Sequence, residues 1–559
     1  MTDVAAPWVD GITIGGTLRE TARQPPARPA LVFPQFQCRR TYAEFDRDVD
    51  DAARALIGLG IKKGEHVALW STNWPQWVVL QFATARIGAV LVTVNPAYRS
   101  HELAYVVRQS EAVAVFLIDK FRSSDYFAMV QEILPELAHA KGPLAAPEYP
   151  RLRHVISLTD QPAAGMTGWR EFLALGKTVS DDALLARESE LTPNDPINIQ
   201  YTSGTTGFPK GATLTHRNLL LNAFYVGDCQ KFSERDGICI NVPFYHCFGC
   251  VLGTLCAAVY GAAMVIPYEY FRPEESLAAI ERERPTAVYG VPTMFIAMLD
   301  HPTRPARDLK SLRTGVMAGS PCPLELMQRV VGEMGVRDLT IAYGLTEASP
   351  VITQTRTDDP IDLRVKTVGR PLPGFEVRLI DPSNGRVLGD EEQGELCARG
   401  HGVMLGYYNM PEQTARTIDA EGWLHTGDLA SRMANGYYRI TGRIKDMVIR
   451  GGENIYPREI EEFLYTHPAV QDVSVVGVPD PKYIEELAAW IRLKPGQTAT
   501  EESIRKYCEG NLARYKVPKY VRFVNEFPQT VTGKIQKFKI RESMIRELGL
   551  DDAASREMA

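Results

Sequence analysis

The alternation of apolar runs and helical stretches in the first third of the chain constrains the fold most strongly. Residues 66–70 and 90–95 are short apolar runs without polar alternation. Between such runs lie stretches such as 44–60, where Phe45 and Leu56 fall on one helical face and glycines end the pattern. Strands that are apolar on both faces and separated by helices are typical of a parallel sheet covered by helices on both sides. The sequence therefore predicts an α/β fold.

The composition and the strand pattern change after about residue 365, where glycines become frequent and short strands with alternating polarity follow one another. With 559 residues the chain is too long for a single core, so two or more domains are expected. We place a large domain at residues 1–442, with the antiparallel strands at about 365–442. A compact α+β unit is expected beyond it.

Composition excludes some classes of function and favours one cellular compartment. The formal net charge of −6 gives no reason to expect nucleic-acid binding, which needs clustered Lys and Arg. Nine cysteines in so long a chain are typical of reduced thiols. The first residues lack a basic stretch followed by an apolar run, so no leader peptide is expected. These features predict a soluble, cytoplasmic protein.

A segment without Asp, Glu, Lys or Arg runs from Gly237 to Tyr268. Its most apolar part, residues 251–266, is shorter than the run of about 20 residues that spans a membrane. We therefore expect a buried helix followed by a buried strand, and no transmembrane segment. Cys247 and Cys250 form a CxxC in this segment, but no second ligand pair follows at zinc-site spacing, so they are interpreted as small core residues at the start of a helix.

The strongest local signal is YTSGTTGFPKGA at residues 201–212, directly after an apolar strand. Its glycines allow backbone N–H groups to approach an anion, its hydroxyls add donors, and Lys210 adds a positive charge. This composition suits a polyphosphate, although the spacing differs from the Walker pattern. The alternative is a polar loop between a strand and a helix that binds nothing.

TSGTTGFPK resembles the phosphate loop of the adenylate-forming (AMP-binding) superfamily, which includes acyl-CoA synthetases, luciferases and peptide-synthetase adenylation domains. Further blocks resemble the same superfamily in the same order: AGSPCP (318–323), YGLTEASP (343–350), GWLHTGD (422–428), GRIKDMVIRGGENIYPREIE (442–461) and PQTVTGKIQK (528–537). PFYHCFG (243–249), MLGYYN (404–409) and GGENIYPREIE are most similar to the branch of medium- and long-chain fatty acyl-CoA synthetases.

The resemblance implies a reaction and a domain layout. ATP, Mg²⁺ and a fatty acid would give acyl-AMP and pyrophosphate, and CoA would then take the acyl group and release AMP. The strands at about 365–442 would form a small β-barrel subdomain of the amino-terminal adenylation domain. A hinge at 443–446, centred on Lys445, would connect it to a mobile carboxy-terminal lid domain at 447–559.

The resemblance also assigns site residues. Lys534, Glu347, Thr346 and Lys210 would be catalytic, and Glu347 would also hold Mg²⁺, as hard carboxylate oxygens do. Asp428 would accept hydrogen bonds from the ribose hydroxyls, and Arg443 would help to fix the ribose. The nucleotide site implied by the resemblance comprises Thr202, Ser203, Gly204, Thr205, Thr206, Gly207, Lys210, Gly319, Ser320, Tyr343, Gly344, Thr346, Asp428, Arg443 and Lys534.

The remaining assignments concern CoA and the acyl chain. Arg450, Gly451, Gly452 and Lys516 are candidates for CoA binding. The acyl pocket would be lined by apolar or aromatic side chains without an acid, namely Tyr245, His246, Phe248, Val291 and Met294. An amino-acid substrate would leave its ammonium group unpaired there and is disfavoured.

Several alternatives stay open at the level of sequence. The acceptor could be a carrier protein in place of CoA, and the acid could be aromatic or branched. A luciferase-type oxygenase or an inactive adenylate-binding regulator would share the fold, but the joint presence of Lys534, Glu347 and Asp428 argues against inactivity. The substrates are small molecules. The sequence does not distinguish a monomer from a homodimer, and it leaves peripheral membrane contact open.

Overall fold

The computed structural model describes residues 7–25, 27–140, 142–202, 209–320, 322–451, 453–509, 511–530 and 535–550. The chain forms two compact units. The first comprises Met1–Glu376 with Ala398–Leu424, and the second comprises Val377–Cys397 with His425–Ala559. Most of the strands expected at about 365–442 thus group with the carboxy-terminal residues, and the hinge at 443–446 stays a prediction.

The first unit contains a seven-stranded sheet in the order β20-β10-β9-β4-β3-β5-β8. Strands β3, β4, β5, β8 and β9 pair in parallel, so the parallel sheet predicted from the apolar runs is confirmed. At one edge β10 and β20 pair antiparallel, which the sequence does not predict. The strands are β3 His66–Trp70, β4 Val90–Val94, β5 Ala114–Leu117, β8 His154–Ser157, β9 Pro196–Thr202, β10 Lys210–Thr215 and β20 Gly406–Tyr407.

The same unit contains a nine-stranded sheet in the order β17-β16-β15-β14-β13-β11-β12-β1-β2. Its centre is parallel, and its edges β2, β16 and β17 are antiparallel. The strands are β1 Pro29–Phe33, β2 Cys38–Thr41, β11 Gly237–Ile240, β12 Ala263–Val265, β13 Ala287–Gly290, β14 Thr314–Ala318, β15 Asp338–Gly344, β16 Val351–Gln354 and β17 Arg370–Pro371; a small hairpin pairs β6 Lys120–Phe121 with β7 Ser124–Asp125.

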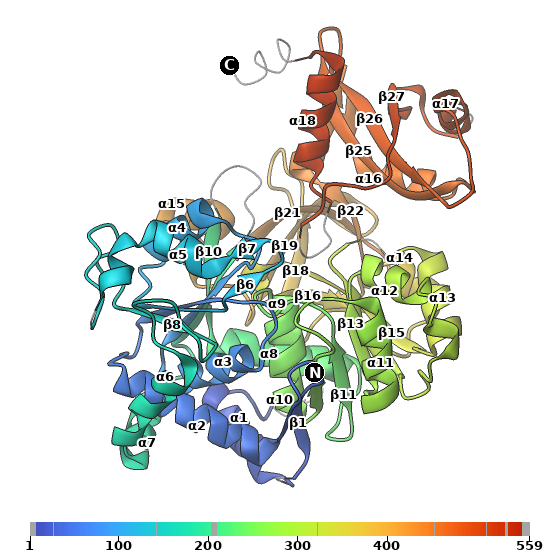
Figure 1. The fold of residues 1–559 in the computed structure, drawn as a ribbon. Helices are drawn as coiled ribbons and strands as arrows, with labels where there is room; N and C mark the ends of the chain where they lie inside the picture. The colour runs from blue at the N-terminus through green and yellow to red at the C-terminus, as the bar shows by residue number, and fades with distance from the viewer. Residues whose placement is uncertain are drawn as a thin grey trace. The chain divides into compact units, whose positions relative to one another are not determined.

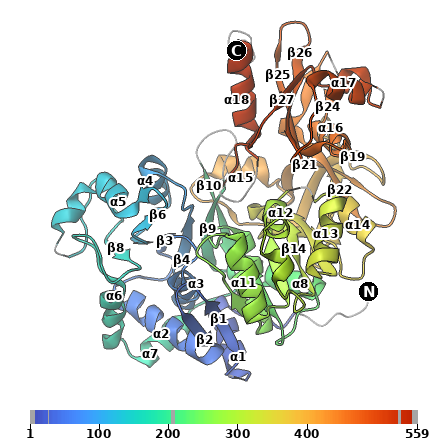
Figure 2. The ribbon, with the colours of Figure 1, turned by 45° about the vertical axis from the view of Figure 1, so that its right-hand side comes forward.

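Helices cover these sheets. In Figures 1 and 2, α11, α12 and α13 lie side by side over the nine-stranded sheet, where Leu277, Phe295 and Met327 share a buried cluster with Val288 and Met317 of the strands. The helices of this unit are α1 Ile14–Arg23, α2 Tyr42–Gly58, α3 Pro75–Ile87, α4 Ser100–Gln109, α5 Tyr126–Ile133, α6 Trp169–Leu175, α7 Asp181–Ser189, α8 His216–Cys229, α9 Cys247–Gly249, α10 Cys256–Tyr260, α11 Pro273–Glu283, α12 Pro292–Leu299, α13 Leu324–Met334, α14 Ile361–Lys366 and α15 Pro411–Thr417.

The charge-free segment forms a buried helix and then a strand, as predicted. Helix α9, a π-helical stretch at Cys250–Leu255 and α10 follow one another, and β12 comes next. Val251, Leu255 and Ala258 have no exposed surface. Across the residues that the structure describes, no helix combines the length and apolar character needed to cross a bilayer.

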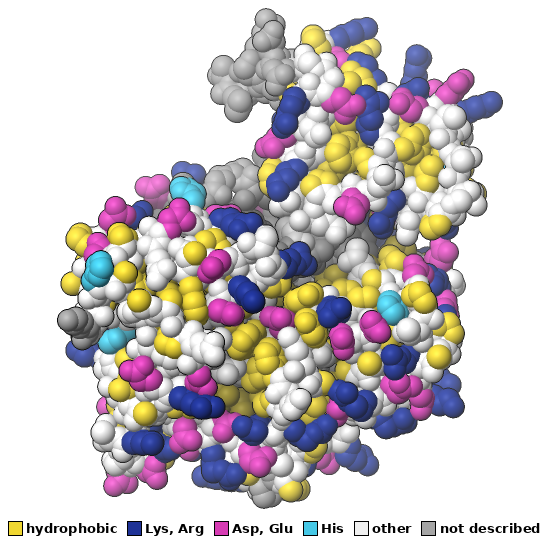
Figure 3. Space-filling view, in the orientation of Figure 1, with side chains coloured by type: hydrophobic (Ala, Val, Ile, Leu, Met, Phe, Trp, Pro, Cys, Tyr) yellow, Lys and Arg dark blue, Asp and Glu magenta, His cyan; other side chains and the backbone are white. Residues whose placement is uncertain are grey.

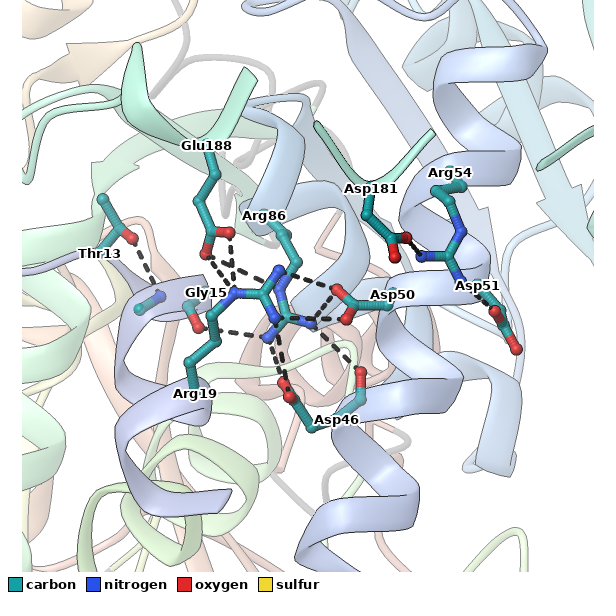
Figure 4. A network of polar contacts seen from close by, with 11 residues as sticks. Thr13, Gly15, Arg19, Asp46, Asp50, Asp51, Arg54, Arg86, Asp181 and Glu188 are labelled. Atoms are coloured by element: carbon teal, nitrogen blue, oxygen red, sulfur yellow. Dashed lines mark hydrogen bonds and ion pairs between the residues drawn. The ribbon is translucent and has the colours of Figure 1, made fainter. Parts of the chain in front are cut away.

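An ion-pair network ties together the helices near the amino terminus (Figure 4). The Arg86 side chain has no exposed surface, and its guanidinium contacts Asp46 Oδ1 at 2.6 Å and Asp50 Oδ1 at 2.7 Å. Arg19 contacts Asp50 Oδ1 at 2.9 Å and Glu188 Oε2 at 2.8 Å. Since these residues come from α1, α2, α3 and α7, the network connects four helices.

The second unit contains two sheets. One has the order β18-β19-β21-β22, and the other has the order β24-β23-β26-β25 with β27 paired to β26. Helix α18 packs on β25, where Ile540 and Met544 share a buried cluster with Val478 and Ala488. Beyond residue 442 the expected α+β arrangement is confirmed. The elements of this unit are β18 Phe375–Ile380, β19 Gln393–Gly400, β21 Leu424–Arg432, β22 Tyr438–Arg443, β23 Val448–Arg450, β24 Glu453–Ile455, α16 Pro457–Leu464, β25 Val470–Asp480, β26 Ile484–Leu493, α17 Glu501–Glu509, β27 Tyr520–Phe523 and α18 Lys537–Leu548.

Charged side chains of both signs are interspersed over the face of the first unit seen in Figure 3. Basic side chains do not gather into one continuous stripe on that visible face. Nucleic-acid binding depends on such clustering, because the phosphate backbone is a dense line of negative charge.

Candidate active site

The two residues that flank the predicted phosphate loop lie on neighbouring strands. Thr202 ends β9 and Lys210 begins β10, and the Thr202 hydroxyl donates to the Lys210 carbonyl oxygen at 3.4 Å. The loop therefore joins two antiparallel strands, and the expectation that it leads from a strand into a helix is wrong. Ser203, Gly204, Thr205, Thr206 and Gly207 lie outside the described residues.

Glu347 lies in a short 3₁₀ turn, η5 (Thr346–Ala348), shortly after β15. Its carboxylate is buried, and Oε1 accepts a hydrogen bond of 2.7 Å from the hydroxyl of Tyr407 in β20. Burial, and then the negative charge of Glu347, raise the pKa of Tyr407, so the hydroxyl keeps its proton and acts as the donor. The Lys210 ammonium lies 4.9 Å from the centroid of the Tyr407 ring. The tyrosine thus connects the phosphate-loop lysine to the acidic turn.

Tyr407 is a site residue that sequence reasoning did not single out, although it belongs to the MLGYYN block. Neighbouring residues give no sign of its role, because its partner Glu347 is 60 positions away. Tyr407 and Glu347 come together because β20 pairs with β10, and β10 in turn contacts the turn η5 that carries Glu347.

The environment of Glu347 fits a divalent cation. Among the described residues no Lys, Arg or His forms an ion pair with this carboxylate, and its polar partner is a neutral hydroxyl. A buried carboxylate without a positive partner is costly, and carboxylate oxygens are among the hard ligands that Mg²⁺ prefers. The residues present therefore suit Mg²⁺.

Glycines keep the backbone accessible beside this turn. Gly344 is exposed, and a Cβ there would lie 1.8 Å from the carbonyl oxygen of Pro350. Gly319 has a φ of +92° and is exposed at the end of β14, next to the exposed Ser320. A Cβ on Gly319 would lie 3.2 Å from Val291 Cγ1, so this predicted nucleotide residue lies beside a predicted acyl-pocket residue. Tyr343 and Thr346 are half-buried on either side of Gly344.

The predicted acyl-pocket residues lie around the start of α9 and α12. Phe248, Val291 and Met294 are each 6% exposed, whereas Tyr245 and His246 are half-buried. The Phe248 ring lies 5.9 Å from the Tyr289 ring, and His246 Nδ1 accepts a hydrogen bond of 3.1 Å from the Phe248 N–H. That bond caps α9 and gives the histidine a structural function.

The CxxC thiols lie in the core at the start of this helix, as predicted. Cys247 Sγ donates to Gln200 Oε1 at 2.9 Å, and Gln200 Nε2 donates to Cys250 Sγ at 3.0 Å. Burial raises the pKa of Cys250 to about 12, so its thiol is protonated at neutral pH.

In the second unit Asp428 and Arg443, the two residues predicted to hold the ribose, form an ion pair with each other. The two residues are Cα partners across β21 and β22, and Arg443 Nε donates to Asp428 Oδ1 at 2.6 Å. Asp428 is 4% exposed, whereas the Arg443 side chain is 41% exposed. A fixed carboxylate of this kind can accept hydrogen bonds from a pair of vicinal hydroxyls.

Two of the CoA candidates hold carboxylates of their own unit. Arg450 forms a bidentate pair with the buried Glu486, at 2.7 and 2.9 Å, and this raises the pKa of Arg450. Lys516 Nζ lies 2.6 and 2.8 Å from the oxygens of Glu459. A phosphate would therefore compete with these carboxylates, and the role in CoA binding stays a prediction.

The remaining carboxy-terminal candidates are described only in part. Lys445 is exposed in a 3₁₀ turn, η6 (Ile444–Asp446). Gly451 has a φ of +61°, and its N–H donates to the Tyr483 carbonyl oxygen at 2.8 Å. Gly452 and Lys534 lie outside the described residues.

Known proteins resemble this chain in both sequence and structure. A family model described as AMP-binding enzyme matches residues 18–408, and one described as AMP-binding enzyme C-terminal domain matches residues 459–534. The chain is 51% identical over 542 residues to "Putative acyl-CoA synthetase YngI" of Bacillus subtilis (strain 168), covering 97% of this chain and 98% of that protein. It is 42% identical over 544 residues to the human mitochondrial medium-chain acyl-CoA ligase ACSF2, covering 96% and 88%.

Solved structures with the same fold include two with nucleotide-derived ligands. The anthranilate CoA ligase AuaEII in complex with anthranoyl-AMP has a TM-score of 0.84 at 28% identity, covering 96% of this chain and 98% of that one. ATP-bound MatB from Rhodopseudomonas palustris has a TM-score of 0.81 at 28% identity, covering 95% and 99%.

Proposed function

The chain belongs to the AMP-binding enzyme family and is an AMP-forming acid–CoA ligase, and we propose that it activates fatty acids of medium to long chain. The reaction uses ATP, Mg²⁺ and CoA. We further propose a cytoplasmic location.

One observation carries the choice of a fatty acid: the predicted acyl-pocket residues Phe248, Val291 and Met294 are each almost fully buried and carry no charge. A charged group on the substrate tail would lose its hydration there without gaining a partner. An aliphatic tail gains roughly 0.8 kcal/mol for each CH₂ that it buries. The human relative's name, medium-chain acyl-CoA ligase, is consistent with this choice.

In the first half-reaction a carboxylate oxygen attacks the α-phosphorus of ATP, the bond to the β-phosphate oxygen breaks, and pyrophosphate leaves. A fatty acid with a pKa near that of Glu is already ionised at neutral pH, so no general base is needed. The enzyme has to hold two anions together and offset their repulsion. We assign this task to the phosphate loop, Lys210 and Lys534.

Glu347 would hold Mg²⁺, which supplies positive charge to the phosphate oxygens when bound. Tyr407 fixes the carboxylate through its 2.7 Å hydrogen bond. We assign close approach of the nucleotide backbone to the exposed Gly319 and Gly344, which have no side chain to stand in the way. In the second unit we assign the ribose hydroxyls to Asp428, held in place by Arg443.

In the second half-reaction the CoA thiol, as a thiolate, attacks the acyl carbonyl, the mixed anhydride breaks, and AMP leaves with the electron pair. We assign Arg450, Gly451, Gly452 and Lys516 to CoA and Lys445 to the hinge between the two steps. For Arg450 and Lys516 this assignment requires release of Glu486 and Glu459.

Pyrophosphate release from ATP tests the substrate class. Octanoic, lauric, palmitic, benzoic, anthranilic and malonic acids would each be supplied with and without CoA, and the thioester product identified by mass. The proposal expects fast release with the aliphatic monoacids and acyl-CoA as product. Turnover confined to benzoic or anthranilic acid would favour an aromatic substrate, to which the likeness to AuaEII points. Transfer of the acyl group to an acyl carrier protein in preference to CoA would overturn CoA as the acceptor.

A further inference from the structure

Three side chains with metal-binding atoms meet on the sheet of the second unit that carries Asp428. Glu395 and Cys397 lie two positions apart on β19, so they point to the same face, and His425 lies on the neighbouring strand β21. The carboxylate, thiol and imidazole atoms all lie within 4.8 Å of one another. His425 Nδ1 is 3.0 Å from Glu395 Oε2 and 3.6 Å from Cys397 Sγ.

The separation of the nitrogen and sulfur atoms matches an edge of a tetrahedral zinc site, and that of the nitrogen and oxygen atoms is slightly shorter than one. Zn²⁺ lies about 2.0–2.1 Å from a histidine nitrogen, about 2.0–2.2 Å from a carboxylate oxygen and about 2.3 Å from a cysteine sulfur. With tetrahedral angles, the nitrogen and sulfur ligands are then about 3.5 Å apart, and the nitrogen and oxygen ligands about 3.4 Å. The observed 3.6 and 3.0 Å need only a small rotation of the Glu395 carboxylate.

The surroundings hold the three side chains in place and leave the histidine partly open to solvent. Cys397 has no exposed surface and Glu395 is 8% exposed, whereas the His425 side chain is 28% exposed and offers a way in. The second oxygen of Glu395 accepts a hydrogen bond of 3.0 Å from the Gly427 N–H. This bond orients the carboxylate, as outer partners orient ligands in metal sites.

We propose that Glu395, Cys397 and His425 bind one divalent ion of the zinc class, distinct from the Mg²⁺ of the reaction. Sulfur and nitrogen ligands favour Zn²⁺ or Co²⁺ over Mg²⁺, which prefers oxygen. The ion takes the place of the thiol proton, which passes to solvent, and the thiolate and carboxylate balance its two positive charges. Three protein ligands leave the fourth position of the tetrahedron for water or another small ligand.

Cobalt substitution tests the site through its spectrum and needs no activity. The full chain, freed of metal with a chelator, would be titrated with Co²⁺ in the presence of excess Mg²⁺. One equivalent should bind with a sulfur-to-cobalt charge-transfer band and the strong visible bands of tetrahedral Co²⁺, and Zn²⁺ should abolish both. Absence of the charge-transfer band at stoichiometric Co²⁺ would overturn the proposal.

Matched variants assign the band to this cluster. Cys397→Ser should lose it, whereas Cys508→Ser, at another buried cysteine of the same unit, should keep it. His425→Gln, at a partly exposed position, should lower the affinity more than about a hundredfold, because removing a ligand costs more than removing its outer partner. If Cys397→Ser does not fold, the His425 variant decides. If the His425→Gln variant keeps the charge-transfer band and binds Co²⁺ with unchanged affinity, the assignment to this cluster is contradicted.

Discussion

The hydrogen bond between Tyr407 and Glu347 allows a sharp test of how the acidic turn is positioned. Tyr407→Phe keeps the aromatic ring beside Lys210 but removes the hydroxyl that donates to Oε1 at 2.7 Å. Both residues are 8% exposed, so water does not readily replace the lost donor. A hydrogen bond to a charged group contributes about 1.5–3 kcal/mol, and we expect the free energy of unfolding to fall by about that amount.

The loss of this hydrogen bond should also weaken transition-state stabilisation in adenylation by a similar free energy, because the proposed Mg²⁺ ligand is no longer fixed. At about 1.4 kcal/mol per factor of ten, kcat/KM for ATP should fall by roughly 10–100-fold. The assay is exchange of labelled pyrophosphate into ATP at several Mg²⁺ concentrations. The Tyr407→Phe variant should need more Mg²⁺ for half-maximal rate.

The adjacent residue supplies a matched control. The Tyr408 hydroxyl also donates to a glutamate at 2.7 Å, but its partner Glu111 is exposed. Exposed interactions of this kind contribute about 0–1 kcal/mol, so Tyr408→Phe should change neither exchange nor stability by more than that. Equal effects of the two substitutions, or full activity of Tyr407→Phe, would refute the positioning role.

Two further predictions concern stability. In urea titration, Arg86→Met should lower the free energy of unfolding by about 3 kcal/mol, the lower end for a broken buried ion pair, because Arg19 still faces Asp50. The control Arg54→Met, whose partner Asp181 is 83% exposed, should lower it by less than about 1 kcal/mol (Figure 4). Similar losses in the two variants would contradict this prediction. Burial lowers the pKa of His216 from 6.5 to about 3. Between pH 6.5 and about pH 3 this histidine is therefore protonated in the unfolded chain but not in the folded one, and the free energy of unfolding falls as the pH falls. Between pH 7 and about pH 4.5 the His216→Asn variant should therefore lose about 2.5 kcal/mol less stability than the native chain. The variant of an exposed histidine, His101→Asn, should lose as much as the native chain. Equal losses in the native and His216→Asn chains would exclude His216 as the cause.

The parallel sheets could be predicted because their signal is local. Apolar runs such as 66–70 must be buried on both faces, and the runs at 66–70 and 90–94 pair in parallel as expected. The family motifs singled out Asp428 and Arg443 separately, whereas their contact follows from the register of β21 and β22.

Contacts between distant segments could not be predicted. Strand β20 is two residues long, too short for a periodicity signal, and its pairing with β10 spans about 190 positions. The same reason hides the Glu486 partner of Arg450, which the sequence alone presents as a free basic residue. The Glu395, Cys397 and His425 cluster depends likewise on which strands are neighbours, since its spacing matches no metal motif.

The measurement that tests the account most directly separates the two half-reactions in a Lys534→Ala variant. Removing the ammonium should slow acyl-AMP formation by about a hundredfold or more, equivalent to about 2.7 kcal/mol, because the charge built up at the α-phosphate is no longer offset. Conversion of supplied acyl-AMP and CoA to thioester should continue at the native rate, and Lys539→Ala, at an exposed lysine nearby, should leave both steps unchanged. Equal loss of both half-reactions in Lys534→Ala, or undiminished acyl-AMP formation, would contradict the account.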